Sequence, residues 1–223
     1  MGTPARKVLG IALAAAAACI LIGFYIVSYV VAGPAPVRPP EAAGEARAVD
    51  LTLQTVASLG ERYQNPSWVS YLVRDGHGVW RHSTVFTVPA HATVHVTVYQ
   101  YDGASGLRNP FFARPQGVDG GVIQVDGKTT DTINPDDASH TFAIAALGLV
   151  VPLPGVADDA ENQCDSAPCG LDKAHRTITF TFHTGKAGHY RWQCFVPCAA
   201  GFIDGFGGAM QSLGYMDGFL NVV

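Results

Sequence analysis

Three side chains in this sequence have the chemistry and spacing of metal ligands. His140 lies in the segment SHTFAI, residues 139–144, and Cys194 and Cys198 lie in YRWQCFVPC, residues 190–198. An imidazole at the edge of one strand and two thiols leaving another could together bind copper, because thiolates favour Cu(I) and imidazole suits copper in either oxidation state. Met210 or Met216 could add a thioether. These residues therefore predict a copper site of His140, Cys194, Cys198 and Met210.

A second imidazole is missing from this candidate set, because no histidine follows His189. Side chains alternate between the two faces of a strand. In residues 189–194 this puts Trp192 and Cys194 on the inward face, and in residues 177–183 it leaves His183 on the outer face. His95 alternates with buried valines and also faces out. Three further histidines read as ordinary surface or structural residues: His82, His91 and His175. His140 is the one histidine expected at the site.

The cysteines also allow a reading without metal. Besides Cys19, the sequence has two close pairs, Cys164 with Cys169 and Cys194 with Cys198. Paired cysteines in an oxidising compartment usually form disulfides. A disulfide is expected between Cys164 and Cys169. For Cys194 and Cys198, a disulfide and a copper site both remain open.

The elements that must position these residues are mostly short strands. Alternating apolar and polar residues between turn signals predict an all-β sandwich or barrel. The expected strands are 68–73, 84–88, 93–99, 121–125, 129–133, 141–144, 177–183, 189–194 and 218–223. Residues 49–61 fit neither the helical nor the strand period, so their structure stays open. Residues 147–171, with three prolines, are expected to form a long loop.

The amino-terminal part predicts a membrane anchor. Residues 8–32 are almost uninterruptedly apolar and long enough to cross a bilayer as a helix. The apolar run is longer than that of a typical cleaved signal peptide, which favours an uncleaved anchor. Arg6 and Lys7 precede them, which predicts a cytoplasmic segment 1–7 in a single-pass cell-membrane protein. A linker at 33–48 would then lead to an extracytoplasmic domain at 49–223. A net charge of -4 with 14% charged residues argues against nucleic-acid binding.

The paired segments resemble the cupredoxin domain of cytochrome c oxidase subunit II. The similarity covers roughly residues 84–223 and implies a cupredoxin-like Greek-key β-sandwich. In that family a strand-edge histidine, a Cys-x-x-x-Cys loop, a later histidine and a methionine build the dinuclear CuA centre. His140 matches the first histidine, Cys194 and Cys198 match the bridging thiolates, and Val196 matches the residue whose carbonyl binds one copper. The later histidine position falls on Phe202 and the methionine position on Gly205, so the ligand set is incomplete.

The resemblance implies a membrane-anchored subunit of a larger respiratory or oxidase-type complex, with copper as cofactor and electron transfer as its role. Two alternatives stay open: a metal-free structural domain with a disulfide between Cys194 and Cys198, and a protein that delivers Cu(I) to another enzyme. No catalytic acid–base pair or activated nucleophile is recognisable in the sequence. A protein that is catalytic by itself is therefore not expected.

Overall fold

The computed structural model describes residues 4–27, 33–60, 67–198 and 208–223. The chain forms two compact units, Met1–Gly33 and Pro34–Val223. The first contains helix α1 (Pro4–Tyr25), whose segment Arg6–Tyr25 has a mean hydropathy of 2.4. This length and hydropathy suffice for a membrane anchor or for a signal sequence. The orientation in a membrane stays a prediction.

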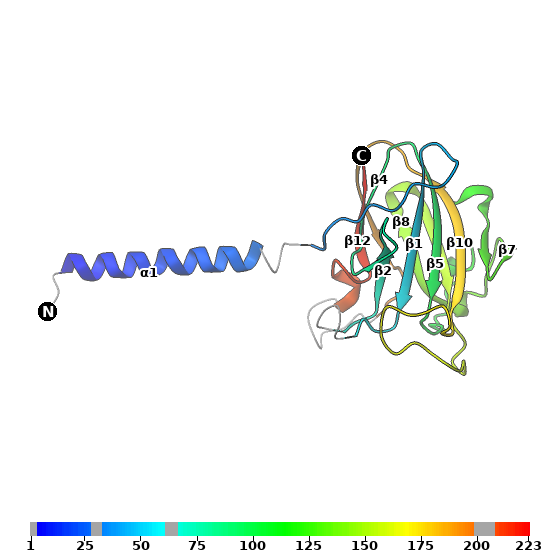
Figure 1. The fold of residues 1–223 in the computed structure, drawn as a ribbon. Helices are drawn as coiled ribbons and strands as arrows, with labels where there is room; N and C mark the ends of the chain where they lie inside the picture. The colour runs from blue at the N-terminus through cyan, green and yellow to red at the C-terminus, as the bar shows by residue number, and fades with distance from the viewer. Residues whose placement is uncertain (1–3, 28–32, 61–66, 199–207) are drawn as a thin grey trace. The chain divides into compact units, whose positions relative to one another are not determined.

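The second unit is a β-sandwich of two sheets (Figure 1). The seven-stranded sheet has the order β3-β2-β1-β5-β10-β6-β7. Its strands are β1 (Ala48–Val56), β2 (Ser70–Arg74), β3 (Trp80–Arg81), β5 (Thr93–Gln100), β6 (Ile123–Val125), β7 (Lys128–Thr130) and β10 (Arg176–His183). The five-stranded sheet has the order β4-β12-β11-β8-β9. Its strands are β4 (Val85–Val88), β8 (Ala138–Ile144), β9 (Leu149–Pro154), β11 (Gly188–Gln193) and β12 (Asp217–Val222).

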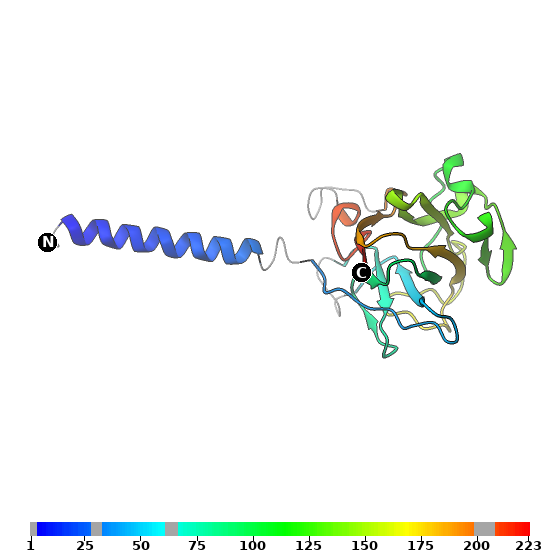
Figure 2. The ribbon, with the colours of Figure 1, turned by 90° about the horizontal axis from the view of Figure 1, so that it is seen from above.

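Figure 2 looks along the strands and shows the connections that close the ends of the sandwich. Several of them contain short 3-10 helices. These are η2 (Pro110–Ala113), η3 (Asp119–Gly121), η4 (Pro135–Asp137), η5 (Ala145–Leu147) and η6 (Gly208–Gln211). Strands β1 and β5 are parallel, and most of the other pairings are antiparallel. Crossovers between non-neighbouring strands make this an all-β sandwich, as the sequence predicted.

Alternation along the strands buries one face of each against the other sheet. In β5 the side chains at every second position, such as Val96, are buried, while His95 is partly exposed. In β10 the phenylalanines and Ile178 are buried, and His183 is exposed. Trp192 of β11 is fully buried and stacks on Phe86, with 5.6 Å between the ring centroids. The predicted directions of these side chains are confirmed.

Residues 49–56, whose structure the sequence left open, belong to β1, an inner strand of the larger sheet. Both faces of β1 are covered near its end, where the polar residues Gln54 and Thr55 are buried along with Leu53. Gln54 exchanges two hydrogen bonds with the backbone of Cys169, at 2.7 and 3.0 Å. A strand covered on both faces loses the alternation by which a half-buried strand is recognised.

The expectation of a continuous loop at 147–171 is wrong, because β9 (Leu149–Pro154) lies inside it. Every residue of β9 is buried, and the strand pairs with β8 at the edge of the smaller sheet. Pro152 and Pro154 lack a backbone N–H, which an edge strand tolerates. The prolines therefore suggested a loop where the chain forms an edge strand.

The stretch 33–48, expected to be a linker, contacts the sandwich over most of its length. The amide of Val37 donates to the carbonyl of Val85 at 2.8 Å, and the Val37 carbonyl accepts from Thr87 at 2.9 Å. The hydroxyl of Ser83 donates to the carbonyl of Ala35 at 2.7 Å. These bonds cover the free edge of β4, so the compact unit begins at Pro34.

Candidate metal centre

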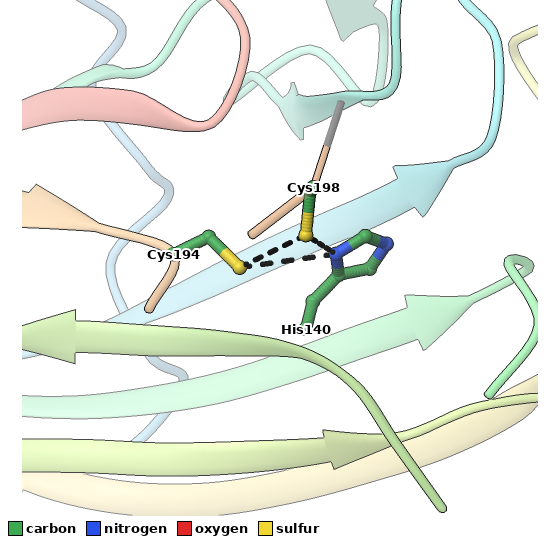
Figure 3. A group of neighbouring side chains, drawn as sticks. All are labelled: His140, Cys194 and Cys198. Carbon is green, nitrogen blue, oxygen red and sulfur yellow. Dashed lines mark hydrogen bonds between the residues drawn. The ribbon is translucent and has the colours of Figure 1, made fainter. Parts of the chain in front are cut away.

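Three of the four predicted ligands meet at one end of the sandwich. His140 comes from the start of β8, and both cysteines follow the end of β11, which neighbours β8 in the smaller sheet. Nδ1 of His140 lies 2.8 Å from Sγ of Cys198 and 3.8 Å from Sγ of Cys194, and the two sulfurs are 3.3 Å apart. Figure 3 shows the imidazole facing both sulfurs. Among the described residues, no other group of three histidine, cysteine or acidic side chains converges in this way.

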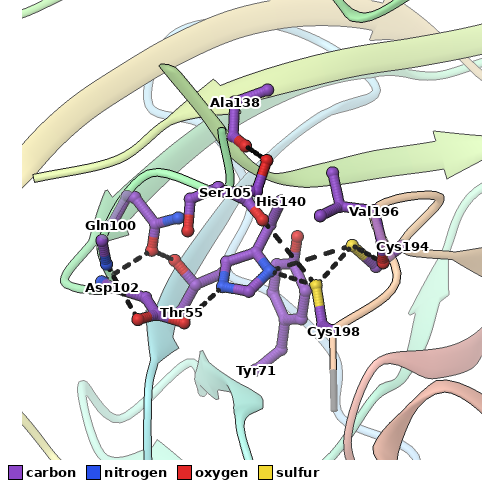
Figure 4. Close-up of polar contacts among 12 residues, drawn as sticks. Thr55, Tyr71, Gln100, Asp102, Ser105, Ala138, His140, Cys194, Val196 and Cys198 are labelled. Atoms are coloured by element: carbon purple, nitrogen blue, oxygen red, sulfur yellow. Dashed lines mark hydrogen bonds and ion pairs between the residues drawn. The ribbon is translucent and has the colours of Figure 1, made fainter. Parts of the chain in front are cut away.

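Asp102, just beyond the end of β5 in the opposite sheet, fixes the imidazole from its other edge. Its carboxylate lies 3.1 Å from Nε2 of His140 (Figure 4). A carboxylate on one ring nitrogen sets the tautomer and orientation in which the other nitrogen faces a metal. The structure therefore aims Nδ1 at the sulfurs.

The same contacts determine the charge of the imidazole. Burial opposes protonation of His140, but the hydrogen bonds with Asp102 and with the Cys194 sulfur outweigh it and raise the pKa of His140 to about 9. The pKa of Asp102 is lowered, because its hydrogen bond and charge interaction with His140 outweigh its partial burial. The carboxylate and the imidazole thus form an ion pair at neutral pH.

The sulfur of Cys194 is held by the backbone of β8 and of its own loop. The amide of Thr141 donates to this sulfur at 3.3 Å, and the hydroxyl of Thr141 accepts the amide of Phe195 at 2.7 Å. Burial raises the pKa of Cys194, but hydrogen bonds with Cys198 and His140 and the Thr141 amide lower it well below its usual value. The pKa of Cys198 is raised, chiefly by its hydrogen bond with the Cys194 sulfur. These contacts thus favour the thiolate form at Cys194 over that at Cys198.

The two pairs of cysteines differ in the structure. Cys164 and Cys169 form the expected disulfide. Cys194 and Cys198 are buried and unbonded. The arrangement of this second pair is that of two separate donors, as a metal site requires.

The remaining residues of the predicted set lie around this group or outside the described chain. The carbonyl oxygen of Val196 lies 3.5 Å from the Cys194 sulfur. Met216 is fully buried, and its carbonyl accepts the amide of Cys194 at 2.9 Å. Met210 lies in η6 and is partly buried against the core. A thioether ligand from either methionine stays a prediction. The positions of Phe202 and Gly205 lie outside the described residues.

The other histidines lie in different surroundings, as expected. His82 hydrogen-bonds to the carbonyl of Gly214, and burial lowers its pKa. His95 contacts Glu45 at 2.9 Å, and His183 contacts Asp119 at 3.0 Å, both on the outer surface. None of these three joins the group around His140.

The donor set suits copper. The three donor atoms lie within 4.8 Å of one another, close enough to share one ion after small side-chain adjustments. His140 is 2% exposed, Cys194 1% and Cys198 8%, so water would be largely excluded from a bound ion. Two thiolates and one imidazole favour Cu(I) and are usual in copper and zinc sites. Thiolate sulfur is a soft donor and so suits a soft cation such as Cu(I).

Asp102 is the functional residue that the sequence did not reveal. It follows β5 by two residues and is 38 positions from His140 in the chain. No local pattern links an acid after one strand to a histidine in the facing sheet. An acidic residue at the site end of a strand is the one signal that could have suggested it.

Comparisons with known proteins find similarity in solved structures alone. No protein-family model matches the sequence, and no curated protein matches it. A structure of the copper protein rusticyanin is 19% identical, with 82% of this chain and 86% of that chain covered and a TM-score of 0.34. Reduced rusticyanin is 18% identical, with 82% and 88% covered and a TM-score of 0.31. Rusticyanin from Thiobacillus ferrooxidans is 17% identical, with 82% and 86% covered and a TM-score of 0.31.

None of these findings tests the resemblance to cytochrome c oxidase subunit II, which stays a prediction. Identities and TM-scores this low carry nothing about the site. The two-sheet topology establishes the sandwich, and the side chains of His140, Cys194 and Cys198 establish a group that can hold a metal ion.

Proposed function

We propose that this protein binds copper through His140, Cys194 and Cys198 and transfers electrons as a membrane-anchored subunit of a larger respiratory or oxidase-type complex. The observation that carries the proposal is the convergence of one imidazole nitrogen and two unbonded sulfurs at the end of the sandwich. Met210 or Met216 is proposed as an additional thioether ligand.

The residues around the ligands support electron transfer. Bound copper would supply a one-electron couple between Cu(I) and Cu(II). Asp102 keeps Nδ1 of His140 directed at the sulfurs, and the Thr141 amide hydrogen-bonds to Cys194. Ligands fixed in this way move little when the charge at the site changes, and hydrogen bonds to sulfur tune the redox potential.

Copper uptake tests the proposal. The reduced full-length protein in detergent should bind one copper per chain and show thiolate-to-copper absorption after oxidation. Cys194→Ser should remove this absorption because it removes one thiolate. The double variant Cys164→Ser/Cys169→Ser removes the disulfide and leaves the cluster intact, so it should keep the absorption. Absence of copper uptake, with a Cys194–Cys198 disulfide found by peptide mapping, would support the metal-free alternative instead.

Delivery of Cu(I) is the second candidate, favoured by the two sulfurs in a three-donor set. Thiolates stabilise Cu(I) over Cu(II). An electron carrier should cycle reversibly between the two states at a defined potential. A delivery protein should hold Cu(I) and release it to an acceptor. Reversible voltammetry of the copper-loaded protein, together with a transfer assay to an apo-acceptor, separates the two roles.

The larger complex is supported by the apolar helix α1, which would bring the domain to a membrane surface. Purification of the full-length protein in mild detergent should recover it with other membrane proteins. Recovery of the protein alone under those conditions would contradict the subunit proposal and leave copper binding untouched.

A further inference from the structure

A pocket of about 350 Å³ opens beside the candidate copper site. Its lining includes His140, Cys198, Asp102, Ser105 and Ser139. Cys194, which is 1% exposed, is not part of the lining. The pocket therefore leads to one of the two sulfurs, and the other lies behind it.

The chemistry of the lining favours a cation. Asp102 supplies a carboxylate whose side chain is 29% exposed, and among the described residues that line the pocket no lysine or arginine is present; His140, which pairs with this carboxylate, is the one basic group there. In Figure 4, Asp102 and Ser105 lie on one side of the imidazole, and Cys194 and Val196 lie on the other. A partly exposed carboxylate in the wall of an open pocket attracts cations and repels anions.

We propose that this pocket is the route by which Cu(I) reaches the site, with Asp102 as its first contact and Cys198 as the first sulfur to bind it. This inference rests on the proposed copper-binding function. Cys194 would complete the site from behind, once the ion has passed Cys198. The order follows from the exposure of the two sulfurs to the pocket.

A test without copper uses two thiol reagents of similar size. Reduced, metal-free, full-length protein in detergent is treated with a methanethiosulfonate carrying either a trimethylammonium or a sulfonate group. In the single variants Cys194→Ser and Cys198→Ser, where no second thiol can displace the reagent, peptide mass mapping should find the remaining Cys198 modified before the remaining Cys194. The cationic reagent should react with Cys198 about tenfold faster than the anionic one, the low end of electrostatic focusing at a charged site. Equal rates for both reagents, or earlier modification of Cys194, would overturn the route.

Blocking the pocket tests the same route from its wall. Ala104 lines the pocket and is exposed, so Ala104→Trp should narrow it without touching a ligand. If the pocket is the route of access, the rate of Cys198 modification should fall by about tenfold. This corresponds to a rise of about 1.4 kcal/mol in the activation free energy. Ala187→Trp is the matched control, because Ala187 is exposed in the turn before β11, at the opposite end from Cys194. Ala57→Trp is a second blocking variant, since Ala57 also lines the pocket and is exposed.

Copper loading then separates the route from the proposed function. Cu(I) supplied as its acetonitrile complex should load more slowly into Ala104→Trp than into the parent or Ala187→Trp, with the same final stoichiometry. Equal loading rates in all three would overturn the route and leave copper binding standing. Failure of every protein to take up copper would overturn the proposed function, and the thiol reagents would still decide whether the pocket gives cations access to Cys198.

Discussion

His140 is held between a carboxylate at one ring nitrogen and two sulfurs at the other. Asp102 comes from the larger sheet and the sulfurs from the loop after β11, so the imidazole joins the two layers at the site end. The hydroxyl of Tyr71 adds a second link between the layers by donating to the carbonyl of Thr141 at 3.0 Å. Contacts from both sheets thus fix the ligands before a metal binds.

Loss of the carboxylate should weaken metal binding. Asp102→Asn keeps the size of the side chain but removes the charge that orients His140 and favours its directed tautomer. Changes to such partners of metal-binding histidines typically cost about 10- to 100-fold in affinity. Competition titration with a Cu(I) chelator measures the change. Asp159→Asn, at an exposed position, is the control and should bind as the parent does; an unchanged affinity in Asp102→Asn would contradict the role of the carboxylate.

The apparent affinity for Cu(I) should rise with pH up to about 9. His140 must lose its ring proton to bind a metal, and its pKa is raised to about 9 from the usual 6.5. Protons therefore compete with copper throughout the neutral range, and this part of the competition ends as pH passes 9. Chelator competition between about pH 6 and 9.5 measures the slope. A flat profile below pH 8 would show that His140 is already neutral there.

At the scale of elements, β12 packs against its neighbours through a glycine. A Cβ at Gly218 would lie 1.9 Å from the carbonyl oxygen of Thr84 and 2.5 Å from Nε1 of Trp192. Trp192 donates through Nε1 to that same carbonyl at 2.9 Å. The close approach of β12 to β4 and the buried indole of β11 therefore require glycine here.

Gly218→Ala should destabilise the domain by about 2 kcal/mol or more, because the added methyl forces backbone atoms apart in a packed core. Urea unfolding followed by tryptophan fluorescence measures the loss. Gly185→Ala is the matched control: its Cβ would meet nothing within 4 Å, and its φ is not in the left-handed region. Similar stability of the two variants would contradict the close packing at Gly218.

Strands with one buried and one polar face were the easiest to recognise from the sequence, although β2 and β8, which are buried over nearly all of their length, were also predicted. β5 and β10 alternate cleanly and were recognisable. β1 and β9 were not, because their residues are buried on both faces or interrupted by prolines. Burial on both faces depends on what packs above and below, which the local sequence does not record.

At the scale of the whole molecule, the compact unit starts before the predicted domain boundary. Asp50 donates to the carbonyl of Pro40 at 2.9 Å, and Ala42 donates to the carbonyl of Ala48 at 2.8 Å. Pro39 is buried. Residues from Pro34 to the start of β1 are thus part of the sandwich unit.

A truncation series should locate this boundary. Protein beginning at Pro34 should be soluble and unfold cooperatively, because it keeps every contact of the second unit. Protein beginning at Ala48 loses the bonds of Val37 and Ala35 to β4 and its neighbour, and should be less stable by about 1–3 kcal/mol. Thermal and urea unfolding of the two proteins measure the difference. Equal stability would show that 34–47 is a linker after all.

The sequence by itself determined the all-β class, the apolar amino-terminal helix, the Cys164–Cys169 disulfide and the identity of the metal-binding candidates. These follow from local periodicity, composition and the chemistry of single residues. Tertiary structure alone decided that Asp102 orients His140, that the sulfurs of Cys194 and Cys198 stay unbonded, and that a pocket reaches only one of them. Each of these depends on how distant strands bring their ends together, and that contact is absent from any local stretch of the chain.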